Sequence, residues 1–188
     1  MSGLDRRTFL DILGTLPSGV TVVTTLDREQ RPHGLTVSAV CSVSAEPPML
    51  LVCIDRRSRT LPILCEAGRF AVNFLRSDRE EIARRFASPV SDRFAGLEWR
   101  EVAPGVPVLD ADILSFAACR LVQQIEAGDH AILVGLAVDG LAPPPLSRPL
   151  TYFRRNYAPW PGDVIRAGDS GGLSAPVPEP DGADRLVG

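Results

Sequence analysis

A row of hydroxyl-bearing side chains follows Gly34. They recur at two-residue spacing in the sequence, at Thr36, Ser38, Ser42 and Ser44. Because alternate residues of a β-strand share one face, we expect the stretch 35–43 to form a single strand that carries these hydroxyls on one side. Such a row can hydrogen-bond a polar, planar ligand. The same alternation occurs in ordinary half-exposed strands, and composition alone favours that second interpretation.

Arginines gather in the next polar segment, residues 55–60, which leads into a short helical stretch at 61–66. Ser58 or Thr60 is placed to cap this helix. The free N–H groups of a helix start, the hydroxyls and the arginines together suit a phosphate group. These arginines are Arg56, Arg57 and Arg59. Taken alone, the segment is more typical of an ordinary helix cap with solvated arginines.

One histidine is placed to do chemistry. His130 follows Gly128 and Asp129 at the start of an apolar β run, although a histidine at a strand end is more often a plain surface residue. The chain has two histidines and four cysteines without a CxxC pair, so we expect no metal site. It has no GxGxxG motif after a strand, no lysine for a Walker motif and no nucleophile elbow. Rossmann, P-loop and acyl-transfer chemistry are therefore disfavoured.

The elements that position these residues are mostly strands. Apolar spacing predicts a helix at 8–16, and Ser77 with Glu80 predicts a capping box at the start of a helix over 77–88. Strands are predicted at 20–25, 35–43, 49–54, 69–75, 114–125, 130–138 and 150–153, with a tight turn at 127–129. Three short helices and no repeated βα rhythm favour a mainly β fold, a closed antiparallel barrel with peripheral helices.

Composition indicates a soluble single domain. The chain has 188 residues, of which 45% are hydrophobic and 23% charged, and no apolar run is long enough to cross a membrane. The N-terminus does not resemble a signal peptide, so we expect a cytoplasmic protein. The net charge of −3 comes from residues 161–188, a Gly/Pro/Asp-rich segment that we expect to be a flexible tail after a domain at 1–160. Neither part has the charge of a nucleic-acid-binding surface.

Several stretches, in order, resemble the flavin reductase family of two-component flavin-dependent monooxygenases, the group that includes 4-hydroxyphenylacetate monooxygenase reductases. The matching stretches are 16–25, 34–44 with Pro47-Pro48, 53–60, 68–75, 83–87, 94–99, Gly128-Asp-His130 with Gly135, and 149–154 with Tyr157. The resemblance covers residues 8 to about 158. Each stretch is weak alone, but the ordered set is specific. Members of this family have an FMN-binding split barrel of antiparallel Greek-key type.

The resemblance implies a homodimer with a flavin, FMN or FAD, near the subunit interface, and NADH or NADPH as the co-substrate. By similarity, the flavin-binding residues would be Ser18, Thr36, Val37, Ser38, Ala39, Cys41, Ser42, Ser44, Asp55, Ser58 and Thr60. His130 would be the catalytic residue, and His130, Tyr152 and Arg154 would bind the nicotinamide. The reduced flavin would pass transiently to an oxygenase component, with no role for nucleic acid or membrane.

Three functions fit this pattern. The leading hypothesis is an NAD(P)H:flavin oxidoreductase that supplies a separate monooxygenase or halogenase. The second is a non-catalytic flavin carrier, which would lack a working nicotinamide pocket around His130 and Arg154. The third is an oxygenase that uses its own flavin, although no segment resembles an added substrate domain. The sequence leaves open FMN against FAD, NADH against NADPH, and the partner oxygenase.

Overall fold

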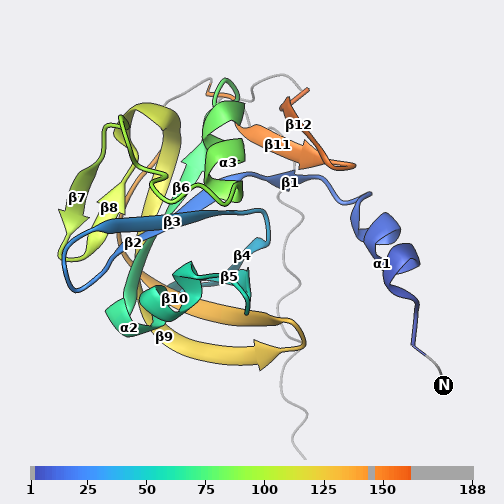
Figure 1. Cartoon of the computed structure of the whole chain (residues 1–188), viewed down its shortest axis with the longest axis horizontal. Coiled ribbons are helices and arrows are strands. Elements are labelled where there is room, and N and C mark those ends of the chain that lie inside the picture. The colour runs from blue at the N-terminus through green and yellow to red at the C-terminus, as the bar shows by residue number, and fades with distance from the viewer. Residues whose placement is uncertain (1–2, 144–146, 162–188) are drawn as a thin grey trace, which may run out of the picture.

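The fold is built around one curved antiparallel sheet (Figure 1). The computed structural model describes residues 3–143 and 147–161, so the expected tail at 161–188 lies almost wholly outside the described residues. The sheet has seven strands in the order β3-β2-β6-β9-β10-β5-β4. These strands are β2 (Thr21–Leu26), β3 (Pro32–Val37), β4 (Val40–Ala45), β5 (Pro48–Asp55), β6 (Arg69–Leu75), β9 (Ile113–Ala127) and β10 (His130–Leu141).

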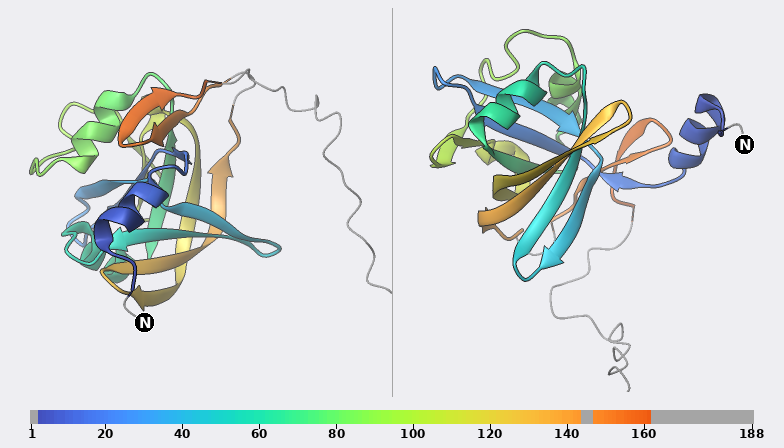
Figure 2. Two further views of the ribbon diagram at one scale, coloured as in Figure 1. Left: turned by 90° about the vertical axis from the view of Figure 1, so that its right-hand side faces the viewer. Right: turned by 90° about the horizontal axis from the view of Figure 1, so that it is seen from below.

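The two edge strands of this sheet, β3 and β4, are consecutive in the chain. Only Ser38 and Ala39 separate them, and the Ala39 carbonyl accepts a hydrogen bond from the N–H of Cys53 on β5 at 3.0 Å. Figure 2 shows the sheet curling round so that these edges approach. The mainly β, barrel-like fold expected from the sequence is therefore confirmed.

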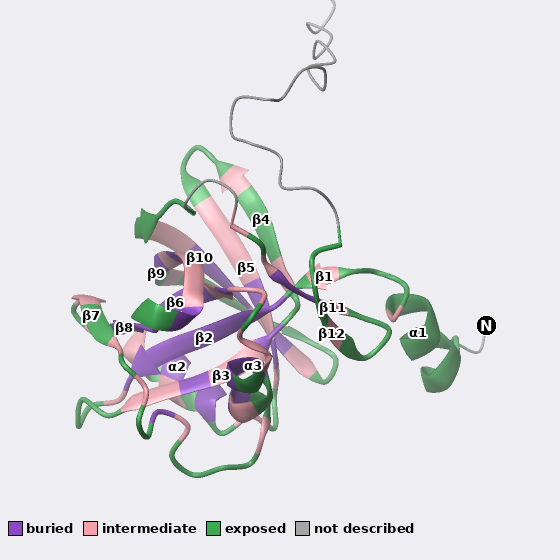
Figure 3. Ribbon diagram, turned by 90° about the horizontal axis from the view of Figure 1, so that it is seen from above, coloured by how far each residue is buried: buried purple, intermediate pink, exposed green. Residues whose placement is uncertain are grey.

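Smaller elements surround the barrel. They are α1 (Arg6–Leu13), β1 (Ser18–Gly19), α2 (Thr60–Ala67), α3 (Glu80–Ala87), β7 (Arg100–Ala103), β8 (Val106–Val108), the 3₁₀ turn η1 (Asp110–Asp112), β11 (Leu150–Phe153) and β12 (Asn156–Pro159). β1, β11 and β12 form a separate three-stranded sheet, and β7 pairs with β8. Figure 3 shows α1 standing away from the buried centre.

Two apolar clusters hold the barrel and its helices together. Inside the barrel, Leu61 and Leu64 of α2 pack among inward-facing side chains that include Phe70. Across β2, the buried face of α3 packs with Ile82 and Phe86 against Val22 and its neighbours. β2 is consequently buried along its whole length. It pairs with the edge strand β3 along one side.

The prediction of one strand over 35–43 is wrong. The chain forms β3 against β2 and then β4 against β5, at opposite edges of the sheet. Sequence alternation continues across the two-residue break, so the pattern alone could not reveal it. A bulge between Ser42 and Ser44 also pairs them with adjacent residues of β5, which places their side chains on opposite faces. The predicted one-sided row of hydroxyls does not form.

The predicted capping box at Ser77 is also wrong. α3 begins at Glu80 with Arg79 as its N-cap residue, and no side chain caps it. The N–H of Ser77 instead donates to the carbonyl of Arg148 at 2.9 Å, beside the isolated bridge between Arg76 and Pro149. A long-range backbone contact therefore holds Ser77 outside the helix. The predicted β9–β10 hairpin, with its turn at residues 127–129, is confirmed.

Candidate functional site

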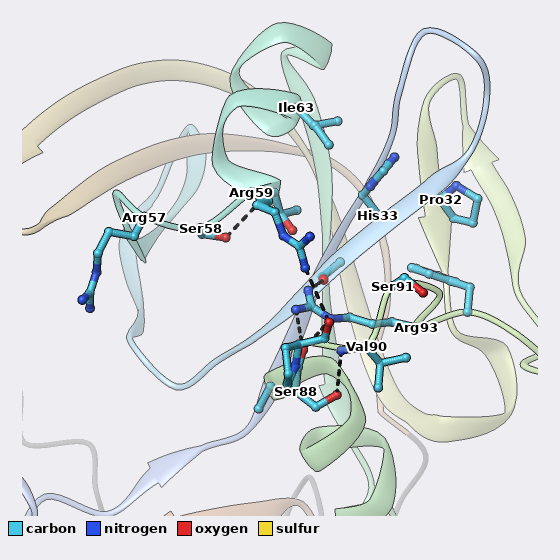
Figure 4. A pocket seen from close by; sticks show the side chains of 15 residues that line it. Pro32, His33, Arg57, Ser58, Arg59, Ile63, Ser88, Val90, Ser91 and Arg93 are labelled. Carbon is cyan, nitrogen blue, oxygen red and sulfur yellow. Dashed lines mark hydrogen bonds between the residues drawn. The ribbon is translucent and has the colours of Figure 1, made fainter.

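A pocket lies between the start of β3, the turn before α2 and the loop after α3. Its volume is about 490 Å³, and Figure 4 shows the side chains around it. Ser58 and Thr60, both predicted from the sequence, contribute to its wall. The Ser58 Oγ accepts a hydrogen bond from the Thr60 N–H at 3.3 Å, although the N-cap residue of α2 is Arg59. The turn thus adopts a helix-start geometry close to the one expected.

Two arginines meet in this pocket. Figure 4 shows the Arg59 side chain extending toward Arg93, while Arg57 points away from both. Arg93 donates through Nη1 to the Gly34 carbonyl at 2.6 Å and through Nη2 to the Ser88 carbonyl at 2.6 Å. Among the described residues, Arg59 makes only a long contact, to the Pro89 carbonyl at 3.5 Å.

The pocket has an excess of positive charge. Within the described part of the chain, neither Arg59 nor Arg93 has a carboxylate partner, and no acidic residue lines the pocket. Burial and, secondarily, the charge of Arg59 lower the pKa of Arg93. Two guanidinium groups that repel each other and face an open cavity favour an anion between them. Sequence reasoning named Arg59 only as part of a cluster and missed Arg93, which no local signal marks.

Of the four residues expected to contact a flavin ring, two are exposed. The Thr36 hydroxyl donates to the Ala83 carbonyl of α3 at 2.6 Å, and the Val37 side chain is buried in the barrel core. Ser38 and Ala39 are exposed at the crossing between the two sheet edges. Ser38 and Ala39, rather than Thr36 or Val37, are therefore accessible to a ligand.

Three further residues that we expected to bind the flavin lie on β4, namely Cys41, Ser42 and Ser44. Cys41 and Ser42 are exposed and Ser44 is half-buried. Cys41 pairs with Leu51, and Ser44 pairs with Met49 beyond the bulge. Cys41 and Ser44 therefore share the face of the sheet that points away from the barrel core, and Ser42 lies on the other face.

Asp55 lies at the end of β5 and directly opposite His130 of β10. Its carboxylate is held by Arg57, with Nη2 to Oδ2 at 2.7 Å, Nε to Oδ1 at 3.1 Å and the backbone N–H to Oδ1 at 2.8 Å. These bonds, the side-chain bonds first, hold the pKa of Asp55 well below its usual range. Asp55 is thus an ionised neighbour of His130 rather than a free proton donor.

His130 begins β10 directly after the turn. Its Nδ1 lies 2.7 Å from Oδ1 of Asp129, and its side chain is 44% exposed. Gly128 adopts a φ of +61°, in the left-handed region that favours glycine, and this allows the tight turn that presents Asp129 and His130. The hydrogen bond from His130 lowers the pKa of Asp129.

The last three expected residues belong to the small sheet of β1, β11 and β12 or to its connecting turn, and they are Ser18, Tyr152 and Arg154. Ser18 of β1 pairs with Tyr152 of β11, and the Tyr152 ring lies 5.0 Å from that of Tyr157. Arg154 has a φ of +47°, and its N–H donates to the Gly14 carbonyl at 3.1 Å. Among the described residues no hydrogen bond, ion pair or ring contact joins His130 to these side chains. Figures 1 and 2 place the β11–β12 hairpin at the opposite end of the fold from the β9–β10 turn.

The described residues contain no group of three side chains suited to a metal ion. None of the helices in the described ranges is long and apolar enough to span a membrane.

Comparison with known proteins places the chain among flavin reductases. Residues 13–161 match the model of the flavin reductase like domain. The chain is 53% identical to a flavin reductase (NADH) from Kitasatospora aureofaciens over 84% of this chain and 83% of that one. It is 34% identical to a reductase subunit of a flavin-dependent monooxygenase from Mycobacterium tuberculosis, over 82% of each.

A solved structure gives the same result. An NADH:FAD oxidoreductase from Streptomyces globisporus, in complex with NAD and FAD fragments, superposes with a TM-score of 0.76 at 27% identity. The match covers 85% of this chain and 97% of that one. Some relatives are longer: this chain spans 56% of the reductase subunit of stachydrine N-demethylase from Rhizobium meliloti, to which it is 37% identical.

Proposed function

The chain belongs to the flavin reductase like family, and on that premise we propose that it is an NAD(P)H-dependent flavin reductase. It transfers a hydride from the nicotinamide to FMN or FAD, and the reduced flavin then passes to a separate monooxygenase or halogenase. The relatives named as NADH-dependent reductases and as reductase subunits of monooxygenases support both parts of this proposal.

The pocket formed by Arg59 and Arg93 carries the proposal. It offers two cations without acidic partners, together with the Ser58 hydroxyl, and this donor set suits the phosphate that FMN and FAD share. The exposed residues Ser38 and Ala39 directly follow Val37, the last residue of β3, and the first residues of that strand line the pocket. A flavin with its phosphate between the arginines would extend its ring along this crossing.

The chain's own residues then have to position the nicotinamide. A bound flavin accepts the hydride, and transfer needs the two rings about 3–3.5 Å apart, so orientation supplies most of the rate enhancement. His130 lies beside the end of β5 from which the chain continues into the Arg59 turn, because it pairs with Asp55, the last residue of β5. We assign it the role of orienting the nicotinamide. Within one chain, Tyr152 and Arg154 lie apart from His130. A pocket that contains all three would therefore need residues from two chains.

A homodimer would supply that arrangement. The apolar face of α1 is exposed at Phe9 and Ile12, whose side chains are 51% and 53% accessible. Val43 on β4 and Val122 and Ile125 on β9 are also exposed apolar side chains. The exposed apolar face of α1 is typical of a surface that a second chain covers.

The test uses three flavins. Purified protein is mixed with NADH or NADPH and with FMN, FAD or riboflavin, and nicotinamide oxidation is followed by absorbance. We expect oxidation above background with FMN or FAD. Flavin that binds tightly without nicotinamide oxidation would instead identify a carrier, and no binding of any flavin would reject both functions.

The arginine variant locates the phosphate. In Arg59→Met, the apparent affinity for FMN should fall about ten- to a hundredfold, because a charge-assisted hydrogen bond contributes roughly 1.5–3 kcal/mol. The affinity for riboflavin, which lacks the phosphate, should stay unchanged. Arg28→Met is the matched control, since Arg28 is an exposed arginine that pairs with Glu66 outside the pocket. An equal loss for FMN and riboflavin would place the phosphate elsewhere.

A further inference from the structure

The side chain of Asp129 contacts the imidazole that follows it in the chain. Its Oδ1 lies 2.7 Å from Nδ1 of His130. Consecutive residues of a regular strand point to opposite faces, so this contact depends on Asp129 lying in the turn just before β10. Two backbone features fix that turn. Gly128 adopts its left-handed conformation, and the Asp129 carbonyl accepts a hydrogen bond from the Arg56 N–H at 3.0 Å.

We infer that Asp129 is a positioning residue that holds the ring of His130 by Nδ1 and leaves Nε2 as the nitrogen that faces the nicotinamide. This rests on the proposed function. A neutral imidazole carries one proton, and the hydrogen bond made by one nitrogen decides which nitrogen is protonated. Asp129 therefore keeps the proton on Nδ1, so that Nε2 is an acceptor for the amide N–H₂ of a nicotinamide carboxamide.

The other charged groups around His130 do not compete for its ring. Asp55, its cross-strand neighbour, has its carboxylate bound by both the side chain and the backbone of Arg57. Arg56 pairs with Glu126 on the adjacent strand at 3.4 Å. In the described part of the chain, Asp129 is thus the one side chain that hydrogen-bonds the His130 ring. Its lowered pKa is consistent with an ionised acceptor.

The tautomer of His130 provides a test that needs no cofactor. The chain has only two histidines, so the spectrum of His130→Ala assigns the ring signals to His130 or His33. Long-range ¹H–¹⁵N NMR at pH 9, where an ordinary imidazole is neutral, should show wild-type His130 protonated at Nδ1. In Asp129→Ala the ring should move toward Nε2 protonation. Identical tautomers in wild type and Asp129→Ala would overturn the inference.

Kinetics test whether Asp129 acts through His130. Asp129→Ala should lower kcat/KM for the nicotinamide by about five- to tenfold, with flavin affinity unchanged. Asp129→Asn should restore most of the rate, because its amide oxygen accepts the same hydrogen bond. In the His130→Ala background, Asp129→Ala should cause no further loss. Equal losses in Asp129→Asn and Asp129→Ala, or an additional loss in the double variant, would overturn the assignment.

Asp139→Ala is the matched control, because Asp139 is an exposed aspartate of β10 whose carboxylate, among the described residues, bonds only the N–H of Gly140. It should keep the wild-type rate. If the wild-type protein oxidises no nicotinamide with any flavin, the proposed function fails, and the NMR result still decides the role of Asp129. If the wild type is active and Asp129→Ala matches it, the positioning role alone fails.

Discussion

Arg93 donates to the backbone carbonyl of Gly34 at 2.6 Å, across 59 residues of sequence. The same guanidinium also donates to the Ser88 carbonyl from both Nε and Nη2. One side chain therefore holds the loop after α3 against the edge strand β3, and in doing so it forms a wall of the proposed phosphate pocket.

Arg93→Met should consequently affect both stability and binding. Loss of these bonds leaves two carbonyls without their donor, which costs about 1–3 kcal/mol in the free energy of unfolding. Urea unfolding of the flavin-free protein measures that cost, and Arg59→Met, which gives up only one long contact, is the comparison. We expect Arg59→Met to unfold like the wild type. Equal stability of Arg93→Met and wild type would show that the bonds to Gly34 and Ser88 contribute nothing.

Gly135 leaves no space for a side chain at the centre of the barrel. A Cβ atom there would lie 2.6 Å from Cζ of Phe70 and 2.8 Å from Cβ of Cys119. Gly135→Ala should therefore lower the free energy of unfolding by about 1–3 kcal/mol through overpacking. Thermal and urea unfolding measure it. Gly19→Ala, where an added Cβ meets nothing within 4 Å, should change stability far less. A Gly135→Ala protein as stable as Gly19→Ala would contradict this packing argument.

The regular elements could be predicted from local pattern, because each depends on neighbours in sequence. The β9–β10 hairpin follows from two apolar runs around Gly128, and α2 follows from the polar turn before its apolar stretch. The break at Ser38–Ala39 could not be predicted in this way. It arises because the sheet closes on itself, and closure depends on pairings between β3 and β2 and between β4 and β5.

The candidate site was predictable only in part for the same reason. The Ser58–Thr60 turn carries its own signal, and it does line the pocket. The contribution of Arg93 depends on the packing of α3 against β2, which a sequence pattern does not contain. The proximity of Asp55 to His130 likewise depends on the register of β5 against β10.

Acid should weaken the fold through Asp55. Arg57 lowers the pKa of this carboxyl in the folded state, so the ionised form stabilises the fold above the ordinary carboxyl pKa of about 3.9. That contribution is lost as the pH falls below this value. The difference in unfolding free energy between wild type and Asp55→Asn should be largest near pH 6 and shrink toward pH 3.

Urea titrations at pH 6, 4.5 and 3 measure this difference. Asp139→Asn serves as the control, since within residues 3–143 and 147–161 the Asp139 carboxylate bonds only the neighbouring N–H of Gly140. A gap between wild type and Asp55→Asn that stays constant over this range would mean that the ion pair with Arg57 does not contribute to stability.

The exposed face of α1 should decide whether two chains associate. Phe9 and Ile12 present apolar surface that the described part of the chain does not cover, and burial of such surface contributes about 25 cal/mol per Å². Phe9→Ser with Ile12→Ser should shift the mass measured by light scattering from twice that of one chain toward a single chain at micromolar concentration. Val90→Ser, at a similarly exposed apolar position in the loop after α3, should leave the mass unchanged. A wild-type protein that is monomeric at these concentrations would contradict the homodimer outright, and a dimer that survives both serines would place the interface on the sheet face around Ile125 instead.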